Sequence, residues 1–211
     1  MMRPSTHAAR LLCAIAIGGL LTGCASGLLP KPPPPPTLLA LDDNGAAAAA
    51  AKARKPLAAT LVVETPRAAA GYDTRNIAYT RRAHEVEYYA LHQWVDTPAH
   101  MLAPLMVRAL QQGGAFRAVV QAPSAASGEL RLETELLQLQ QDYTQTPSRV
   151  SLQMRAVLVD SATRRVLATK EFNINAVAAS EDPYAGAAAA NVALRQLLAE
   201  LAAFCAEAAA R

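Results

Sequence analysis

Three segments in the second half of the chain alternate apolar with polar residues. The apolar positions are two apart in residues 130–136, 150–158 and 172–176. Successive side chains of a strand point to opposite faces, so this period predicts three strands, each with one apolar and one solvated face. A turn at Asp160 to Arg164 separates the last two segments. The pattern therefore predicts an antiparallel meander, whose apolar face needs a second layer to cover it.

The alternation breaks after Leu136. The apolar positions move to Leu137 and Leu139, out of phase with those before them. An extra residue in one strand shifts the facing of the side chains that follow it, so we expect a β-bulge near Leu136.

A segment near the middle of the chain has helix signals at both ends. Asp96 or Thr97 is the expected N-cap, Pro98 takes the first helical position, and the glycine pair 113–114 ends the helix. Pro104 lies inside this helix, where we expect it to kink the helix or to delay its regular part.

The C-terminal part of the chain predicts a longer helix that docks on the sheet. Asp182 and Pro183 supply its cap and its first position. An apolar stripe follows at helical spacing. The stripe is made of Leu194, Leu197, Leu198, Leu201, Phe204 and Cys205.

Shorter apolar segments predict the other strands. They are residues 37–41, 57–64, 77–79, 85–94 and 116–121. In the segment 85–94, Val86, Tyr88, Ala90 and Trp94 are expected on one face. Together the elements predict an α+β fold, a mostly antiparallel sheet with two helices packed on one face.

The amino-terminal residues have the pattern of a bacterial signal peptide that ends in a lipobox. Arg3 and Arg10 form a basic head, the apolar run 11–21 is too short to span a bilayer, and the run closes as Leu21, Thr22, Gly23, Cys24. The resemblance to substrates of the lipoprotein pathway implies cleavage before Cys24, a diacylglycerol on its thiol and a third acyl chain, expected as palmitate. Three chains exceed what stable anchoring needs. An ordinary secretory signal with an accidental cysteine is the alternative.

These features predict three parts of the chain: a signal peptide at 1–23, a lipidated Cys24 with a proline-rich tether at 24–36, and a domain at 37–211. Pro30 and the run 32–36 favour a stiff polyproline II tether. Loss of the signal peptide leaves 18 basic against 17 acidic residues, since Arg3 and Arg10 leave with it. A nearly neutral domain has no electrostatic footprint for nucleic acid.

No catalytic or metal-binding constellation is visible in the sequence. His84, His92 and His100 are eight apart, a spacing that separates strand residues by roughly 26 Å, too far for one metal. Cys205 is expected as a small buried hydrophobe. Neither a nucleophile elbow nor a glycine-rich phosphate loop occurs. We therefore expect a chain that is not an enzyme and that uses no metal and no cofactor.

Four of the ten aromatic residues fall within sixteen positions: Tyr79, Tyr88, Tyr89 and Trp94. One role for them is to fill the seam between the sheet and the first helix. The other is a partner interface, where Tyr and Trp combine a large apolar area with a polar tip. These four are the candidate partner-binding residues.

Further motifs follow the tether along residues 38–206. They are Leu38 to Leu41, Leu61 to Pro66, Tyr72 to Tyr79, Tyr88, Tyr89, Trp94, Pro98, Met101, Leu102, Pro104, Leu105, Gly114, Phe116, Val119, Gly128, Glu129 and Leu130. In series with the lipobox, they resemble the ABC-type transport auxiliary lipoproteins, the family that includes the paraquat-inducible lipoprotein. Thr37 or Leu38 stands where that family usually has an aromatic residue.

The resemblance implies a non-enzymatic periplasmic domain similar in fold to the amino-terminal domain of the Tol-system propeller protein. It implies as partners an inner-membrane ABC permease with its ATPase and a periplasmic mammalian-cell-entry-type (MCE-type) protein. The cargo class would be phospholipid or another hydrophobic molecule. Ala25 follows the anchor where retained inner-membrane lipoproteins often carry Asp. By its resemblance to known sorting signals, the anchor is expected in the inner leaflet of the outer membrane.

Three other functions stay open at this point. The chain could be a structural lipoprotein for envelope assembly, such as a lipopolysaccharide-transport plug. It could be a lipid-binding carrier, which needs an apolar cavity, or an anchored hydrolase, for which no nucleophile was found. A homo-oligomer is compatible with each of them.

Overall fold

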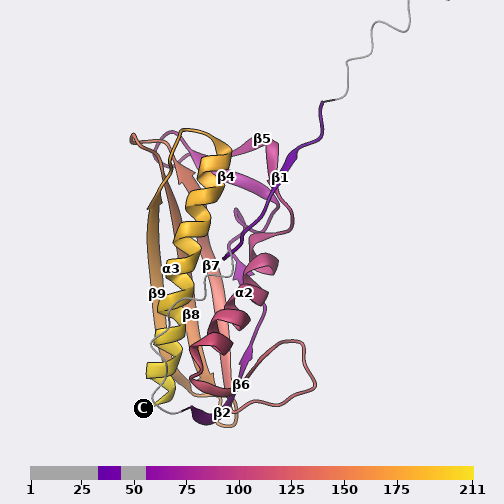
Figure 1. Cartoon of the computed structure of the whole chain (residues 1–211), viewed down its shortest axis with the longest axis vertical. Helices are drawn as coiled ribbons and strands as arrows, with labels where there is room; N and C mark the ends of the chain where they lie inside the picture. Colours follow the sequence, from indigo (N-terminus) through magenta and orange to yellow (C-terminus); the bar gives the residue numbers. More distant parts are fainter. Residues whose placement is uncertain (1–32, 44–55) are drawn as a thin grey trace, which may run out of the picture. The chain divides into compact units, whose positions relative to one another are not determined.

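Residues 33–43 and 56–211 are described by a computed structural model of the chain (Figure 1). Apart from residues 44–55, they cover the compact unit that begins at Pro36 and ends at Arg211. The expected signal peptide, Cys24 and most of the proline tether lie outside the described residues.

The three alternating segments form the long strands of the sheet. They are β7 (Leu130–Asp142), β8 (Arg149–Asp160) and β9 (Val166–Val177), and each is antiparallel to the next. Their alternate residues are buried, as the period of two requires. The register of β7 against β8 shifts between Leu136 and Gln138. The predicted meander and the predicted bulge are therefore confirmed.

Three short strands lie end to end along the other edge of β7, and all three are parallel to it. They are β2 (Leu57–Val63), β3 (Arg67–Ala68) and β4 (Asn76–Thr80). The two-residue strand β3 was not predicted, because a segment so short has no period to detect. The sheet is thus mixed: its longest ladders are antiparallel, and short parallel pairings extend it.

The sheet continues outward from these short strands. Strand β6 (Phe116–Gln121) flanks β2 in parallel, and β5 (Glu87–Trp94) flanks β4 antiparallel. Strand β1 (Thr37–Leu39) pairs with β5 in parallel and forms one edge of the sheet.

Two helices cover one face of the sheet (Figure 1). Helix α3 (Pro183–Ala209) packs on β8 and β9, while α2 (Pro98–Gly113) packs on β6 and against α3. The predicted two-helix layer on one face is confirmed. The residues of the predicted α3 stripe are buried, apart from Phe204, which is partly buried.

Helix α2 begins at Pro98 and runs through Pro104 without a break. The expectation that Pro104 delays the regular part of the helix is therefore wrong. Pro104 lies on the exposed side of α2, where the carbonyl that loses its intrahelical donor can be hydrated. The helix ends at Gly114, whose φ of 61° is the left-handed conformation that glycine adopts at little cost.

Helix α3 is capped as predicted, since the Asp182 carboxylate accepts a hydrogen bond from the Ala185 N–H at 2.9 Å. By length and composition alone, α3 would also be apolar enough to cross a membrane. Half of its most apolar window is buried inside the domain. Its hydropathy is therefore explained by the stripe that packs on the sheet.

The predicted facing of residues in β5 is wrong. Val86, Tyr88 and Ala90 are exposed, whereas Trp94 is buried. The cause is an irregular pairing with β4: Asn76 and Ala78 are two apart, but their partners Gln93 and Tyr88 are five apart. Extra residues in one strand shift the facing of the side chains that follow, so a strict period of two cannot hold along β5.

Candidate docking surface

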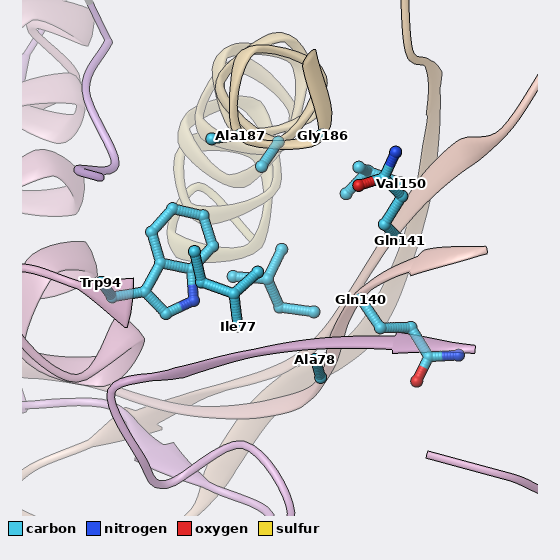
Figure 2. Close-up of a pocket in the computed structure, with 10 residues that line it drawn as sticks. Ile77, Ala78, Trp94, Gln140, Gln141, Val150, Gly186 and Ala187 are labelled. Carbon is cyan, nitrogen blue, oxygen red and sulfur yellow. The ribbon is translucent and has the colours of Figure 1, made fainter. Parts of the chain in front are cut away.

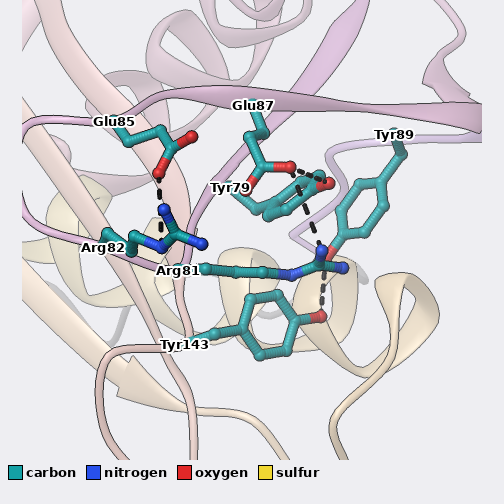
Figure 3. A network of polar contacts seen from close by, with 7 residues as sticks. All are labelled: Tyr79, Arg81, Arg82, Glu85, Glu87, Tyr89 and Tyr143. Atoms are coloured by element: carbon teal, nitrogen blue, oxygen red, sulfur yellow. Dashed lines mark hydrogen bonds and ion pairs between the residues drawn. The ribbon is translucent and has the colours of Figure 1, made fainter.

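The aromatic residues at the β4–β5 end form a stacked cluster (Figure 3). The Tyr79 and Tyr89 rings stack with their centroids 4.4 Å apart, and the Tyr143 ring meets Tyr79 edge-on at 5.9 Å. The Arg81 guanidinium lies 5.0 Å from the centroid of Tyr79. These contacts are favourable aromatic and cation–π geometries. The Tyr79 side chain is buried, so it contributes to the fold and offers no surface to a partner.

The hydroxyl groups of this cluster are used internally. Tyr79 donates to the Glu87 carboxylate at 2.8 Å, and this hydrogen bond is the main reason that the pKa of Tyr79 is raised. Burial raises the pKa of Tyr89 far above its usual value. Its hydroxyl shares a hydrogen bond with that of Tyr143 and donates to Gln141 at 3.0 Å. These phenols stay protonated at neutral pH, so they are poor candidates for a general base.

A buried polar chain connects this cluster to the start of α3. Gln141 lies on the apolar face of β7 and donates to the Ser148 hydroxyl at 3.0 Å. The Ser148 N–H donates to Glu181, just before α3, at 2.8 Å. The Gln141 side chain fills the space that a Cβ on Gly186 would need. The polar chain therefore holds the helix against the sheet.

The other two predicted aromatic residues lie in opposite environments. Tyr88 is 41% exposed and donates its hydroxyl to the Gly71 carbonyl at 3.0 Å. Trp94 is 3% exposed and lines a small pocket with Ile77 and Ala187 (Figure 2). Of the four predicted residues, Tyr88 alone is largely exposed. The structure thus brings Tyr79 and Tyr89 together and leaves Tyr88 and Trp94 apart from them.

The pocket beside Trp94 has a volume of about 10 Å³. That space holds about one water molecule. A lipid acyl chain needs a site of roughly 300 Å³ or more. The pocket in Figure 2 is therefore a packing defect between the sheet and α3, and it is too small for a lipid.

His84, His92 and His100 were the histidines considered for a metal site. Within residues 33–43 and 56–211, no three His, Cys, Asp or Glu side chains form a group that could hold a metal ion. Cys205 is fully buried, and burial raises the pKa of its thiol to about 12. A thiol of this kind is a poor nucleophile at neutral pH.

A wide groove on the surface runs between β1 and α3. Its volume is about 500 Å³, and its walls include Leu38, Tyr184, Val192 and Arg195. Leu38 is 50%, Tyr184 74% and Val192 49% exposed. An exposed apolar groove with a charged rim is typical of an interaction surface.

This groove was not predicted from the sequence. Its signal is a second stripe on α3, in which Tyr184, Ala188 and Val192 follow at intervals of four and Arg195 comes three later. The stripe is less apolar than the buried one, so its periodicity is a weaker signal in the sequence. The facing strand, β1, was predicted, but its position beside α3 depends on the tertiary fold.

A family model places the chain among known proteins. The ABC-type transport auxiliary lipoprotein component model matches residues 40–202, most of the described domain. The chain therefore belongs to the ABC-type transport auxiliary lipoprotein family. Membership indicates a membrane-anchored periplasmic protein with an auxiliary part in ABC-type transport. No curated protein matches the chain.

Solved structures have the same fold. Protein XCC0632 from Xanthomonas campestris is 24% identical, with a TM-score of 0.71 over 82% of this chain and 96% of that one. An uncharacterized protein is 15% identical, with a TM-score of 0.56 over 72% of this chain and 93% of that one. At these identities the likeness extends to the fold alone.

Proposed function

We propose that this chain is an outer-membrane-anchored lipoprotein that acts as a non-catalytic docking module in an ABC/MCE-type lipid-transport system. Its family membership carries the proposal, because that family is auxiliary to ABC-type transport. The periplasmic MCE-type protein and its ABC transporter are the proposed partners. The expected likeness to the amino-terminal domain of the Tol-system propeller protein stays a prediction.

The anchor is supported by the sequence at Cys24. The basic head, the short apolar run and the lipobox occur in the order that lipoprotein processing requires. Ala25 supports sorting to the outer membrane, by resemblance to known signals. The proline tether would then hold the domain off the bilayer surface.

The packed interior favours docking over lipid carriage. The pocket between the sheet and α3 has room for about one water molecule, and the core around it is filled by leucine, alanine and other apolar side chains. A carrier would need an apolar cavity of acyl-chain size. The large groove lies instead on the surface, where another protein can reach it.

The test is recovery of the transport complex from the native bacterium. A tagged, lipidated chain is extracted in mild detergent, and co-purifying proteins are identified by mass spectrometry. We expect an ABC permease, its ATPase and an MCE-type protein. Deletion of the gene should also raise sensitivity to detergents, and a Cys24→Ala copy should fail to restore resistance.

Photo-crosslinking from Tyr88 separates this function from envelope assembly. Tyr88 is exposed, so a crosslinking residue there disturbs no core contact. Crosslinks to an MCE-type protein would agree with the proposal. Crosslinks to an outer-membrane β-barrel protein, together with no recovery of transporter subunits, would favour an envelope-assembly lipoprotein.

A further inference from the structure

Strand β9 forms a long open edge of the sheet (Figure 1). Among the described strands it pairs with β8 alone. It is twelve residues long, it contains no proline, and its ladder with β8 is regular from residue 168 to residue 177. An edge of this kind offers unpaired main-chain groups to another strand, which proteins commonly prevent with short strands, bulges or inward-pointing charges.

The main-chain groups of alternate β9 residues point to the open edge. The Ala178 N–H donates to the Ser148 carbonyl at 2.9 Å, so these two residues form a hydrogen-bonded pair. Hydrogen-bonded and non-hydrogen-bonded pairs alternate along antiparallel strands, so every second β9 residue before Ala178 directs its N–H and C=O away from β8. In the last part of the strand these residues are Glu171, Asn173, Asn175 and Val177.

The first half of β9 is protected from strand addition. Its register against β8 shifts at Leu167, which forms a bulge between Val166 and Ala168. The Lys170 side chain points to the helix side, where its ammonium lies 3.6 Å from the Glu200 carboxylate on α3. Both features are devices that keep sheet edges apart. The edge that is open to another strand is therefore residues 171–177.

The segment 171–177 is complementary to a second copy of itself. Antiparallel pairing about Ile174 places Asn173 opposite Asn175, and Glu171 opposite Val177. All the outward-pointing residues of the segment then find main-chain partners. The amide side chains that face each other can both donate and accept, and no carboxylate lies opposite another, which would be unfavourable.

A cation lies beside this edge. Arg149 on β8 is exposed and is the ladder partner of Val177. Within the described part of the chain, no carboxylate forms an ion pair with Arg149. Its partner on β7, Asp142, accepts from the Thr144 N–H at 2.8 Å. In the pairing about Ile174, a carboxylate of the second copy would lie two strands away from Arg149, roughly 10 Å between main chains.

We propose that two copies of this chain pair through residues 171–177 of β9, antiparallel about a two-fold axis at Ile174. The pairing joins the two sheets into one and places Arg149 of each copy near Glu171 of the other. Glu171 bonds to Arg155 of its own chain, and its carboxylate has acceptor capacity left for a second guanidinium. A two-fold interface uses the same surface on both copies, as the self-complementary segment requires. This inference stands independently of the docking function.

Proline at position 175 tests the pairing. The Asn175 N–H points to the open edge, so Asn175→Pro removes a donor from the interface and none from the ladder with β8. Sedimentation equilibrium of the full chain in mild detergent should show dimers, and the dissociation constant should rise at least about tenfold in the variant. Asn175→Ala is the matched control, because it keeps the N–H. Unchanged circular dichroism shows that the variants are folded.

The sign of a charge at position 177 supplies a test that leaves the backbone unaltered. Val177→Glu places a carboxylate opposite Glu171 of the other copy and should weaken the dimer at least about threefold. Val177→Lys, of similar size and opposite charge, should not weaken it. Val177 is 54% exposed, so neither variant disturbs the core. Equal weakening by both charges would count against the pairing.

Cysteine pairs identify the register. Two differently tagged copies, one with Asn173→Cys and one with Asn175→Cys, are mixed and oxidised. We expect a disulfide between them, because the Cα atoms of a hydrogen-bonded pair lie about 5.5 Å apart. Ser151→Cys mixed with Gln153→Cys is the control, since both residues lie on β8, one strand away from the edge. The native Cys205 is fully buried and does not compete.

Three outcomes would overturn the proposal. The first is a chain that sediments as a monomer at all concentrations. The second is an oligomer that Asn175→Pro leaves as stable as before. The third is the absence of the mixed disulfide, or its formation to the same extent in the β8 control.

Discussion

At the residue scale, Gly186 and Gln141 depend on each other. Gly186 lies in the first part of α3, where alanine would normally be the better helix former. The buried Gln141 side chain occupies the space beside it and donates to Ser148. The glycine is therefore needed for a close approach and has an ordinary helical backbone.

We expect Gly186→Ala to destabilise the domain. Its methyl group would overlap the amide of Gln141, and overpacking of this kind costs about 1–3 kcal/mol. The free energy of unfolding, measured by urea denaturation, should fall accordingly.

The effect should change sign once the amide is removed. In a Gln141→Ala background the three atoms nearest to the added methyl group are gone, and Gly186→Ala should then stabilise α3 by up to about 1 kcal/mol. If Gly186→Ala destabilises the native chain and the Gln141→Ala variant equally, a contact other than the one with Gln141 requires glycine at position 186.

Cys205 should make stability fall at high pH. Burial raises the pKa of its thiol from 9.0 to about 12. Above about pH 9 the unfolded chain releases this proton while the folded chain keeps it, so the free energy of unfolding decreases as pH rises. Below pH 9 both states are protonated and the thiol contributes no slope.

The comparison with Cys205→Ala isolates this contribution. The advantage of the native chain over the variant should shrink by about 1.4 kcal/mol between pH 8 and pH 10, because only the native chain has this thiol. The tyrosines titrate in both proteins, so their contribution cancels in the comparison. Urea denaturation at the two values measures it. An advantage that is the same at both pH values would mean that the thiol titrates alike in both states.

At the scale of elements, α3 holds the segment that enters the domain from the tether. The Asn191 amide donates to the Ala40 carbonyl and accepts from the Asp42 N–H at 2.9 Å. Leu41 is buried between these contacts, and the Asp43 carboxylate lies 3.3 Å from Arg108 on α2. The segment of residues 40–43 is thus attached to both helices.

Asn191→Ala should loosen this attachment. Loss of two hydrogen bonds, each contributing about 1 kcal/mol, should speed hydrogen exchange of the Asp42 amide and lower the free energy of unfolding by about 1–2 kcal/mol. Mass spectrometry of exchanged peptides measures the first effect. Gln196→Ala is the matched control, since its amide bonds to Glu200 on the same helix. If exchange at Asp42 is unaffected, Asn191 does not hold the segment.

The two predicted helices and the meander show where periodicity suffices. Alternation is strict along β8, and both helices have a proline at their first position. In β5, by contrast, the extra residues opposite β4 decide which side chains are buried. Because that pairing joins segments that only the folded chain brings together, the burial of Trp94 and the exposure of Tyr88 could not be predicted from alternation.

At the scale of the whole molecule, the function we propose requires the lipid anchor. Cys24→Ser should abolish incorporation of radiolabelled palmitate and release the chain from membranes, because acylation needs the thiol. Cell fractionation and labelling measure both effects. Cys13→Ser is the control: Cys13 lies in the apolar run of the signal peptide, so labelling should continue. Persistent labelling of Cys24→Ser would place the acyl chains elsewhere.

The amino-acid sequence by itself determined the two helices, the long strands and the resemblance to the family. Strict alternation, helix caps and the lipobox are local patterns, and each has a local physical cause: the pleat of a strand, the unpaired groups at a helix end, the small residues that precede a modified cysteine. Of the candidate site, the sequence identified an aromatic cluster, but it could not tell which rings would be buried.

Tertiary structure alone decided where the surface groove between β1 and α3 lies. Leu38 on β1 and Arg195 on α3 are more than 150 positions apart, and they line one groove because β1 pairs with β5 and Asn191 holds the adjoining segment on α3. The packing of α3 on the sheet likewise leaves only about 10 Å³ in the pocket beside Trp94. Contacts between such distant segments depend on how whole elements pack, which no local period in the sequence records.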